Sequence, residues 1–275
     1  MNELHTTFQR NGFLVLEGFK SDMECQSLIE RSRELATNFT REENRSVFDT
    51  KNQSQTADEY FLDSGDKISF FFEPGTSGEE GRINKDTYST LNKIGHALHD
   101  LDPTFSEFSR SLSMKQLSAE LKMNDYHLIQ SMLIFKHAKI GGVVDLHQDS
   151  TFLYTEPDSC IGFWFALEDA TIDNGCLWAK PGGHQTALRK RFKRKYGGGV
   201  ELVDINSDPL TMEGMVPLEV KKGTCIVLHG LLPHFSYPNT SGKARPAYAI
   251  HTVNSTALYP DDNWLRKPEY SLSGF

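Results

Sequence analysis

Residues 143–150 read VVDLHQDS, and this stretch indicates both the fold and its chemistry. Its composition is that of a strand, and strand side chains at i and i+2 share a face, so His147 and Asp149 are predicted to point the same way. His234 follows later, and Arg245 comes 11 residues after it (245 − 234). Two imidazoles and a carboxylate are the ligand set of non-haem Fe(II) sites with open positions. We therefore expect iron at His147, Asp149 and His234, with Arg245 suited to a carboxylate.

The third ligand is ambiguous, because His229 and His234 both follow one apolar strand. His234 is favoured, since Ser236 lies on its face at i+2. In the strand that begins at Arg245, the small residues Ala247 and Ala249 share one face with Arg245 and His251 and are expected to leave room for a ligand. His229 is then expected to be structural.

Zinc is the competing metal, because two histidines and a carboxylate also serve catalytic zinc. The H-E-x-x-H helix of zinc proteases is not found in the sequence. Affinity does not decide between the metals, since zinc binds most such sites more tightly than iron.

From Gln130 onward, short strands alternate with turn signals such as Gly141-Gly142 and Pro181-Gly182-Gly183. Eight short strands at this spacing predict a sandwich or jelly roll rather than a parallel sheet. The predicted strands are 130–137, 143–150, 161–167, 176–180, 218–220, 224–229, 234–237 and 247–253.

The first part of the chain is predicted to be mainly helical. Ser21 and Glu24 form a capping box that opens a helix to about Thr37. Leucines and an isoleucine at helical spacing predict a second helix over 87–101, and one or two shorter helices follow over 105–121. A strand is expected over 66–73, a turn into a short strand over 8–19, and a loop over 40–56. We expect one domain, 1–275, with a helical flank (1–125) packed on a jelly-roll core (126–275): a mainly β, cupin-like α+β fold.

The composition narrows the classes of partner. The 275 residues include 18 Phe. The formal net charge of −8 argues against nucleic acid or an anionic membrane as the main partner. No apolar run is long enough to span a bilayer. The four cysteines are scattered, as expected of reduced thiols. We expect a monomeric cytoplasmic protein that acts on a small molecule, with the nucleus as the second choice of location and the peroxisome disfavoured by the lack of an S-K-L ending.

The run RKRFKRK, residues 189–195, holds six basic residues in this acidic protein. It could attract an anionic substrate or act as a nuclear-localisation patch. A solvated, mobile loop is the favoured interpretation.

Several stretches together resemble the phytanoyl-CoA dioxygenase family of Fe(II)/2-oxoglutarate oxygenases, and one branch of it most closely. They are KIGHALH (93–99), QSM (130–132), HQDSTFLYTEP (147–157), EDA (168–170), NGCLW (174–178), PGGH (181–184), and the segment from His229 through His234 to Arg245. The similarity covers most of the chain and is strongest from Gln130 onward.

The resemblance implies a double-stranded β-helix around the iron. It makes His147, Asp149 and His234 the catalytic metal ligands, and Arg245 the partner of the C5 carboxylate of 2-oxoglutarate. Further co-substrate contacts are implied at Lys93, Met132, Trp164 and Ser236. Without the resemblance, Lys93 would be an exposed helix lysine, and Met132 and Trp164 would be core residues.

The implied activity consumes O₂ and 2-oxoglutarate, releases succinate and CO₂, and uses ascorbate as a reductant of the iron. Hydroxylation, or demethylation through hydroxylation, of an acyl-CoA or other anionic small molecule is expected, and retention of Asp149 favours this over halogenation. Two other classes remain open at this point. One is a non-catalytic barrel that senses 2-oxoglutarate or serves as an interaction module. The other is a zinc hydrolase, in which Arg245 would be incidental.

Overall fold

The computed structural model describes residues 3–39, 46–47, 59–74, 87–266 and 272–275. Within these ranges the strands form three sheets, of eight, four and two strands. All neighbouring strands run antiparallel except β2 and β3. Among the helices of the described ranges, none has both the length and the apolar character needed to cross a membrane.

Two of the sheets face each other and form the predicted jelly roll. The large sheet has at its centre β5 (Tyr126–Ile134), β14 (Ala247–Asn254), β7 (Ile161–Ala166) and β12 (Cys225–His229). The four-stranded sheet contains β11 (Val216–Leu218), β8 (Leu177–Ala179), β13 (His234–Ser236) and β6 (Val144–His147). The predictions of eight short strands and of a mainly β, cupin-like fold are therefore confirmed.

Successive side chains of β14 point alternately into two separate hydrophobic clusters. Tyr248 and Ile250 face the N-terminal helices, in a cluster with Leu28, Phe105 and Met114. Ala247 and Ala249 face the opposite way, between the two sheets, beside Trp164. Two small side chains of β14 therefore lie on its inner face.

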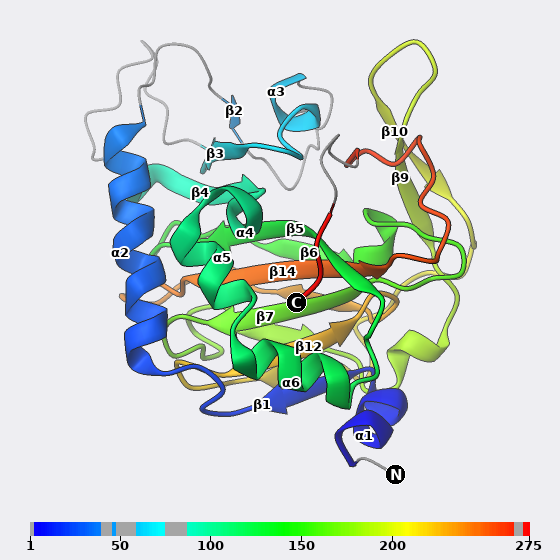
Figure 1. The fold of residues 1–275 in the computed structure, drawn as a ribbon, viewed down its shortest axis with the longest axis horizontal. Helices are drawn as coiled ribbons and strands as arrows, with labels where there is room; N and C mark the ends of the chain where they lie inside the picture. The colour runs from blue at the N-terminus through cyan, green and yellow to red at the C-terminus, as the bar shows by residue number, and fades with distance from the viewer. Residues whose placement is uncertain (1–2, 40–45, 48–58, 75–86, 267–271) are drawn as a thin grey trace.

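The N-terminal part adds helices to one face of the large sheet and strands to both of its edges. Figure 1 shows α5 and α6 lying across the face formed by β5, β14, β7 and β12, with α2 along one end. The elements are α1 (Glu3–Asn11), β1 (Phe13–Leu16), α2 (Asp22–Asn38), β2 (Ser46–Val47), α3 (Glu59–Leu62), β3 (Ile68–Phe72), β4 (Leu91–His96), α4 (Leu98–Leu101), α5 (Pro103–Ser109) and α6 (Leu112–Glu120). The capping box of Ser21 and Glu24 at the start of α2 is confirmed.

The helix predicted over 87–101 is wrong. Residues Leu91–His96 form β4, which pairs with β3 on one side and β5 on the other, and only Leu98–Leu101 is α-helical. A strand that is buried on both faces shows no polar alternation, so Leu91 and Ile94 mimicked a helical stripe. Most of the loop predicted over 40–56 lies outside the described residues, although Ser46–Val47 forms the short strand β2.

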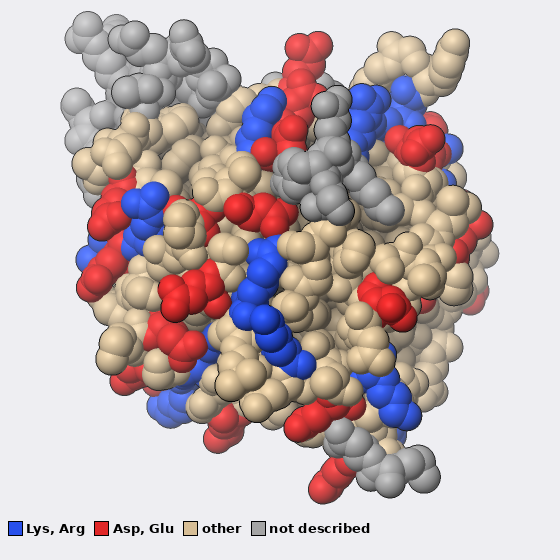
Figure 2. Space-filling view, viewed as in Figure 1, with Lys and Arg blue, Asp and Glu red and all other residues tan. Residues whose placement is uncertain are grey.

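The basic run is also not a solvated loop. It forms β9 (Lys190–Arg194), which pairs with β10 (Val200–Asp204) in a hairpin. Acidic partners face its lysines across the hairpin, with Lys190 Nζ 3.7 Å from Asp204 and Lys193 Nζ 3.7 Å from Glu201. Figure 2 shows Asp and Glu side chains beside Lys and Arg in this region, at the upper right. Phe192 is buried, so one face of β9 belongs to the core.

Candidate metal centre and co-substrate site

Two histidines and an aspartate meet where β6 and β13 pair. His147 is the last residue of β6 and lies directly opposite His234 on β13, and their ring centroids are 4.3 Å apart. Asp149 does not continue the strand, as the sequence reasoning had assumed, but opens a 3-10 turn (η3, Asp149–Thr151). The turn nevertheless brings its carboxylate to the same point, because it bends the chain back toward the two rings.

The donor atoms of the three side chains converge. Asp149 Oδ1 lies 3.5 Å from His147 Nε2 and 3.6 Å from His234 Nε2. One ligand atom from each residue lies within 4.8 Å of the others. Neighbouring ligands at ~2.1 Å from one metal ion would be separated by about 3 Å. The cluster is therefore close to the size that a single ion needs.

The backbone sets the orientation of both imidazoles. His147 Nδ1 lies 2.7 Å from the carbonyl oxygen of Asp145, and His234 Nδ1 lies 3.0 Å from that of Leu232. When Nδ1–H donates to a carbonyl, the lone pair of Nε2 is free for a metal ion. Both Nε2 atoms face Asp149. With the proton on Nδ1, each ring has the tautomer that metal binding through Nε2 requires.

The charges of the cluster favour a cation. Burial opposes ionisation of Asp149, but the charges of His234 and His251 hold the pKa of its carboxyl well below the usual range. Burial lowers the pKa of His234 to about 4, so this ring is neutral at neutral pH. Burial also disfavours the charged form of His147, but hydrogen bonding and attraction to Asp149 raise its pKa overall. A buried carboxylate beside two imidazoles, which bind a metal ion in their neutral form, is a ligand set for a divalent metal ion.

A third histidine borders the cluster. His251 Nε2 lies 3.4 Å from Asp149 Oδ2, the carboxylate oxygen that has no hydrogen-bond partner among the described residues. Gly162 leaves space for this contact, because a Cβ there would come within 3.2 Å of Oδ2. Sequence reasoning placed His251 on the inner face of its strand but gave it no role. The only signal was its position six residues after Arg245 on that face.

Arg245 lies buried at the far end of β14 from His251. It is 1% exposed, its guanidinium lies 5.2 Å from the centroid of the Trp164 ring, and its Nε and Nη1 have no hydrogen-bond partner among the described residues. Burial lowers its pKa to about 10, so it stays charged at neutral pH. A buried cation without a counter-charge is unfavourable by several kcal/mol unless an anion pairs with it. A carboxylate would supply that pairing bidentately.

The other predicted co-substrate contacts lie between these two ends. Ser236 follows His234 by two residues on β13, and its hydroxyl accepts a hydrogen bond from Lys136 Nζ at 2.8 Å. Met132 and Trp164 lie on opposite sides of Ala249, on β5 and β7. Sequence reasoning did not single out Lys136.

Lys93 is buried on β4 rather than exposed on a helix. Its ammonium lies 5.4 and 5.2 Å from the ring centroids of Phe61 and Phe71, and burial lowers its pKa to about 7. Its charge also acts on His96, which in turn interacts with His251. Strand register places Lys93 opposite Ile134, which in turn lies opposite Ala247, two residues after Arg245.

A cavity of about 990 Å³ opens onto the cluster. Its wall includes His147, Asp149, Lys93, Met132 and Lys136, whereas His234, Trp164, Ser236 and Arg245 are not part of it. Apolar and aromatic side chains form much of the rest, including Phe61, Phe152, Leu153, Phe192, Leu202 and Trp264.

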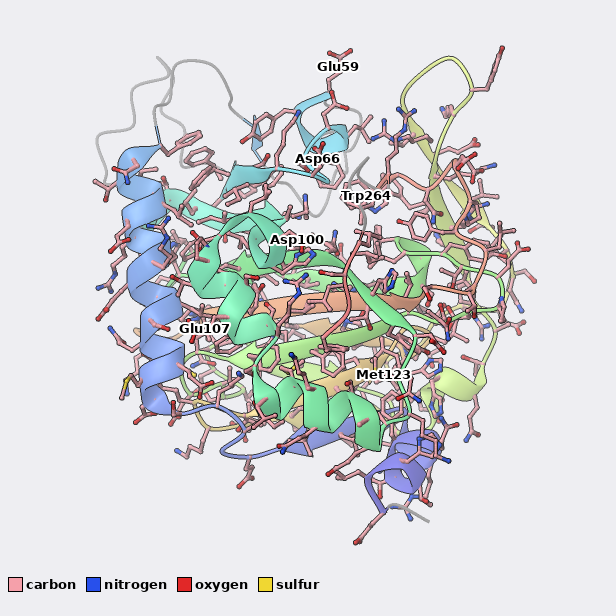
Figure 3. The ribbon with its side chains drawn as sticks, in the orientation of Figure 1. Glu59, Asp66, Asp100, Glu107, Met123 and Trp264 are labelled. Atoms are coloured by element: carbon pink, nitrogen blue, oxygen red, sulfur yellow. The ribbon has the colours of Figure 1, made fainter. Side chains whose placement is uncertain are left out.

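Trp264 connects the two sides of this cavity. Figure 3 shows it between α3 and the β9–β10 hairpin. It stacks on Phe61 with ring centroids 4.5 Å apart and contacts Phe192 at 6.4 Å. The hairpin also contributes Arg189 and Lys190 to the wall, so part of the basic run faces the cavity.

His229, the alternative third ligand, and three further histidines lie outside the cluster. His229 ends β12 and lies against His184, with ring centroids 5.0 Å apart, and His184 Nε2 lies 3.1 Å from the carbonyl oxygen of Gln9. His96 contacts Ser64, and His99 contacts Ser131. None of these four belongs to the metal-ligating group found in the described residues.

The model of the phytanoyl-CoA dioxygenase family matches residues 8–247. This chain belongs to that family. A protein from Arabidopsis thaliana described as phytanoyl-CoA dioxygenase is 42% identical over 261 residues, covering 94% of this chain and 91% of the relative. The phytanoyl-CoA dioxygenase domain-containing protein 1 of Bos taurus is 39% identical over 273 residues, covering 94% and 92%. The family is one of 2-oxoglutarate-dependent non-haem iron oxygenases, and the chain is an enzyme of that class.

Solved structures share the fold at low sequence identity. The non-haem α-ketoglutarate-dependent epimerase SnoN matches with a TM-score of 0.64 and 14% identity, covering 93% of this chain and 84% of that one. EvdO2 of Micromonospora carbonacea var. aurantiaca, complexed with 2-oxoglutarate, matches with a TM-score of 0.59 and 19% identity, covering 94% and 92%. At these identities the likeness establishes the jelly-roll fold alone.

Proposed function

We propose that this family member binds Fe(II) through His147, Asp149 and His234 and uses 2-oxoglutarate and O₂ to hydroxylate a small molecule. Demethylation through hydroxylation of a methyl group is the same reaction with a different fate of the product. The observation that carries the proposal is the convergence of both Nε2 atoms on Asp149 Oδ1 beside a large cavity. The donor set fits the metal, because it supplies three ligands on one side and leaves the cavity side open.

The side chains would divide the work of binding the co-substrate. Arg245, with Ser236, would hold the C5 carboxylate, while Lys93, Met132 and Trp164 would contact the rest of the co-substrate. The unpartnered Nε and Nη1 of Arg245 support this assignment. Bound ferrous iron would supply the redox chemistry with O₂, which amino-acid side chains lack, with ascorbate as the reductant that keeps it ferrous.

The overall reaction uses one O₂ for two oxidations, one of 2-oxoglutarate and one of the substrate. One oxygen atom enters succinate as 2-oxoglutarate loses CO₂, and the other enters the C–H bond of the substrate. The residues of this chain position the reactants, since none of them needs to act as a nucleophile.

The cavity supports a substrate with an apolar body and an anionic group. Phe61, Phe152 and Trp264 offer apolar surface, while Arg189 and Lys190 lie on the hairpin side. Acyl-CoA esters and other anionic amphiphiles fit this description, and curated relatives are described as phytanoyl-CoA dioxygenases. We also propose that the protein is a monomer in the cytosol. The four cysteines, all buried and unpaired, support a reducing compartment.

Succinate release from 2-oxoglutarate, without any added substrate, tests the proposal. Protein reconstituted with Fe(II) is expected to release succinate slowly, and Asp149→Ala is expected to release none. Equal release by wild type and Asp149→Ala would refute the ligand assignment. A zinc hydrolase would form no succinate with either metal.

A further inference from the structure

Lys136 adopts a conformation that a lysine rarely has. It follows β5 with a backbone φ of 40°, in the left-handed region, and is only 2% exposed. Such backbone conformations cost about 1–3 kcal/mol outside glycine and cluster at functional sites. The carbonyl of Lys136 is fixed by the backbone N–H of Arg245 at 3.1 Å and by the Asn239 amide at 2.9 Å. The position of this residue is therefore closely defined.

Two glycines make room for the buried lysine. A Cβ at Gly175 would lie 2.2 Å from Lys136 Cε and 2.5 Å from the carbonyl oxygen of Tyr237. A Cβ at Gly141 would lie 2.6 Å from Lys136 Cγ and 2.7 Å from its Cα. Any other residue at either position would force the lysine or its backbone to move.

The ammonium has neutral hydrogen-bond acceptors at two of its three donor positions. Lys136 Nζ donates to the carbonyl oxygen of Gly142 and to Ser236 Oγ, each at 2.8 Å. Burial, followed by the charge of Arg245, lowers its pKa to about 6, although Glu73 acts in the opposite direction. Burial beside Arg245 disfavours the protonated form of this amine, and a carboxylate between the two side chains would favour it.

Lys136 also reaches the cavity, which Arg245 does not. A carboxylate that entered from the metal side along β13 would pass His234 and then meet Ser236, whose hydroxyl is already hydrogen-bonded to Lys136.

We propose that Lys136 is a second cationic contact for the distal carboxylate of 2-oxoglutarate, acting together with Arg245. The proposal rests on the proposed function, because it assumes that 2-oxoglutarate occupies this site. Its consequence is selectivity: Lys136 favours a dicarboxylic 2-oxo acid over a monocarboxylic acid of the same length. A purely structural lysine would not discriminate between them.

Calorimetric titration of two acids into the Zn(II)-loaded protein tests this directly, with Zn(II) as a redox-inert substitute for Fe(II). The acids are 2-oxoglutarate and 2-oxopentanoate, which lacks the distal carboxylate. Lys136→Met is expected to weaken 2-oxoglutarate binding about 10- to 100-fold, the value of a charge-assisted hydrogen bond, and to change 2-oxopentanoate binding less than about 3-fold. Lys115→Met, which changes an exposed lysine on α6, is the matched control and is expected to leave the binding of both acids unchanged.

Lys136→Gln removes the charge but keeps an N–H donor on a slightly shorter side chain, so it helps to separate charge from packing. It is expected to show the same selective loss, with thermal melting used to establish that it is folded. Equal weakening of both acids in folded Lys136 variants, or of neither, would overturn the proposal while leaving the proposed function intact. Failure of the wild-type protein to bind 2-oxoglutarate would instead overturn the proposed function.

Discussion

The backbone N–H of Arg189 donates a hydrogen bond to the side-chain oxygen of Gln148 at 2.9 Å. Gln148 lies between the two metal-site residues His147 and Asp149, and Arg189 directly precedes β9. The other end of the same amide donates to the carbonyl oxygen of Leu231 at 2.8 Å, three residues before His234. One fully buried glutamine therefore connects both ligand-bearing segments to the hairpin that forms the cavity wall.

Gln148→Ala should lower the free energy of unfolding by about 1–3 kcal/mol, because it leaves a buried N–H and a buried carbonyl without partners. Thermal melting of the metal-free protein measures the change. Gln185→Ala is the matched control, since Gln185 is exposed, and its effect should stay within about 0.5 kcal/mol. Equal melting temperatures for both variants would show that the Gln148 bridge does not stabilise the fold.

Arg245→Met should weaken 2-oxoglutarate binding by about 2–5 kcal/mol, or about 30-fold and upward, because it removes a buried partner of the carboxylate. Metal affinity should be unchanged, since Arg245 lies outside the metal-ligating group of the described residues. Calorimetry with metal and with 2-oxoglutarate separates the two effects. Unaltered 2-oxoglutarate affinity would make the arginine incidental, as a zinc hydrolase would have it.

His251→Ala should weaken metal binding about 10- to 100-fold, the usual effect of losing a group that orients a ligand. The reason is the contact of His251 Nε2 with Asp149 Oδ2 at 3.4 Å, which holds the carboxylate in place. Titration with Co(II) measures the affinity. His184→Ala removes a histidine remote from the cluster and should bind Co(II) like wild type; if His251→Ala does the same, His251 has no positioning role.

Binding of 2-oxoglutarate should take up a proton at pH 8. Without an anion, burial holds the pKa of Lys136 at about 6, so the amine is mostly neutral at this pH. A carboxylate beside it favours the charged form and raises the pKa, so the proton enters as the acid binds. Uptake should approach one proton at pH 8 and decline as the pH falls toward 6 and below, where the amine is already protonated.

Calorimetry of the metal-loaded protein in buffers of different ionisation enthalpy counts these protons. Lys136→Met should show no uptake. Proton-neutral binding by the wild type at pH 8 would contradict the assigned contact of Lys136 with the carboxylate.

The barrel could be predicted from the sequence because its strands are short and separated by glycine-rich turns. The cluster could be predicted because the H-x-D pattern and a later histidine fix the ligand types. The wrong predictions concern segments whose environment is set by residues distant in the sequence. Lys93 and its neighbours were read as a helix, since nothing local reveals that β3 and β5 cover both edges of β4.

The prediction of a solvated loop for the basic run was wrong for a related reason. Counting charges along one segment cannot show that Asp204 and Glu201 face its lysines across a hairpin. Lys136 was not singled out, because a lysine near the end of a predicted strand is ordinarily exposed. Its burial follows from Gly141 and Gly175, which only the fold brings around it.

The central claim is that the His147–Asp149–His234 cluster holds a metal ion and that this ion, together with the Arg245 end, binds 2-oxoglutarate. Anaerobic calorimetric titration of 2-oxoglutarate into Fe(II)-loaded, metal-free and Asp149→Ala proteins tests it most directly. We expect clear one-to-one binding only to the Fe(II)-loaded wild type. Absence of binding there, or equal binding to the metal-free protein, would contradict the claim.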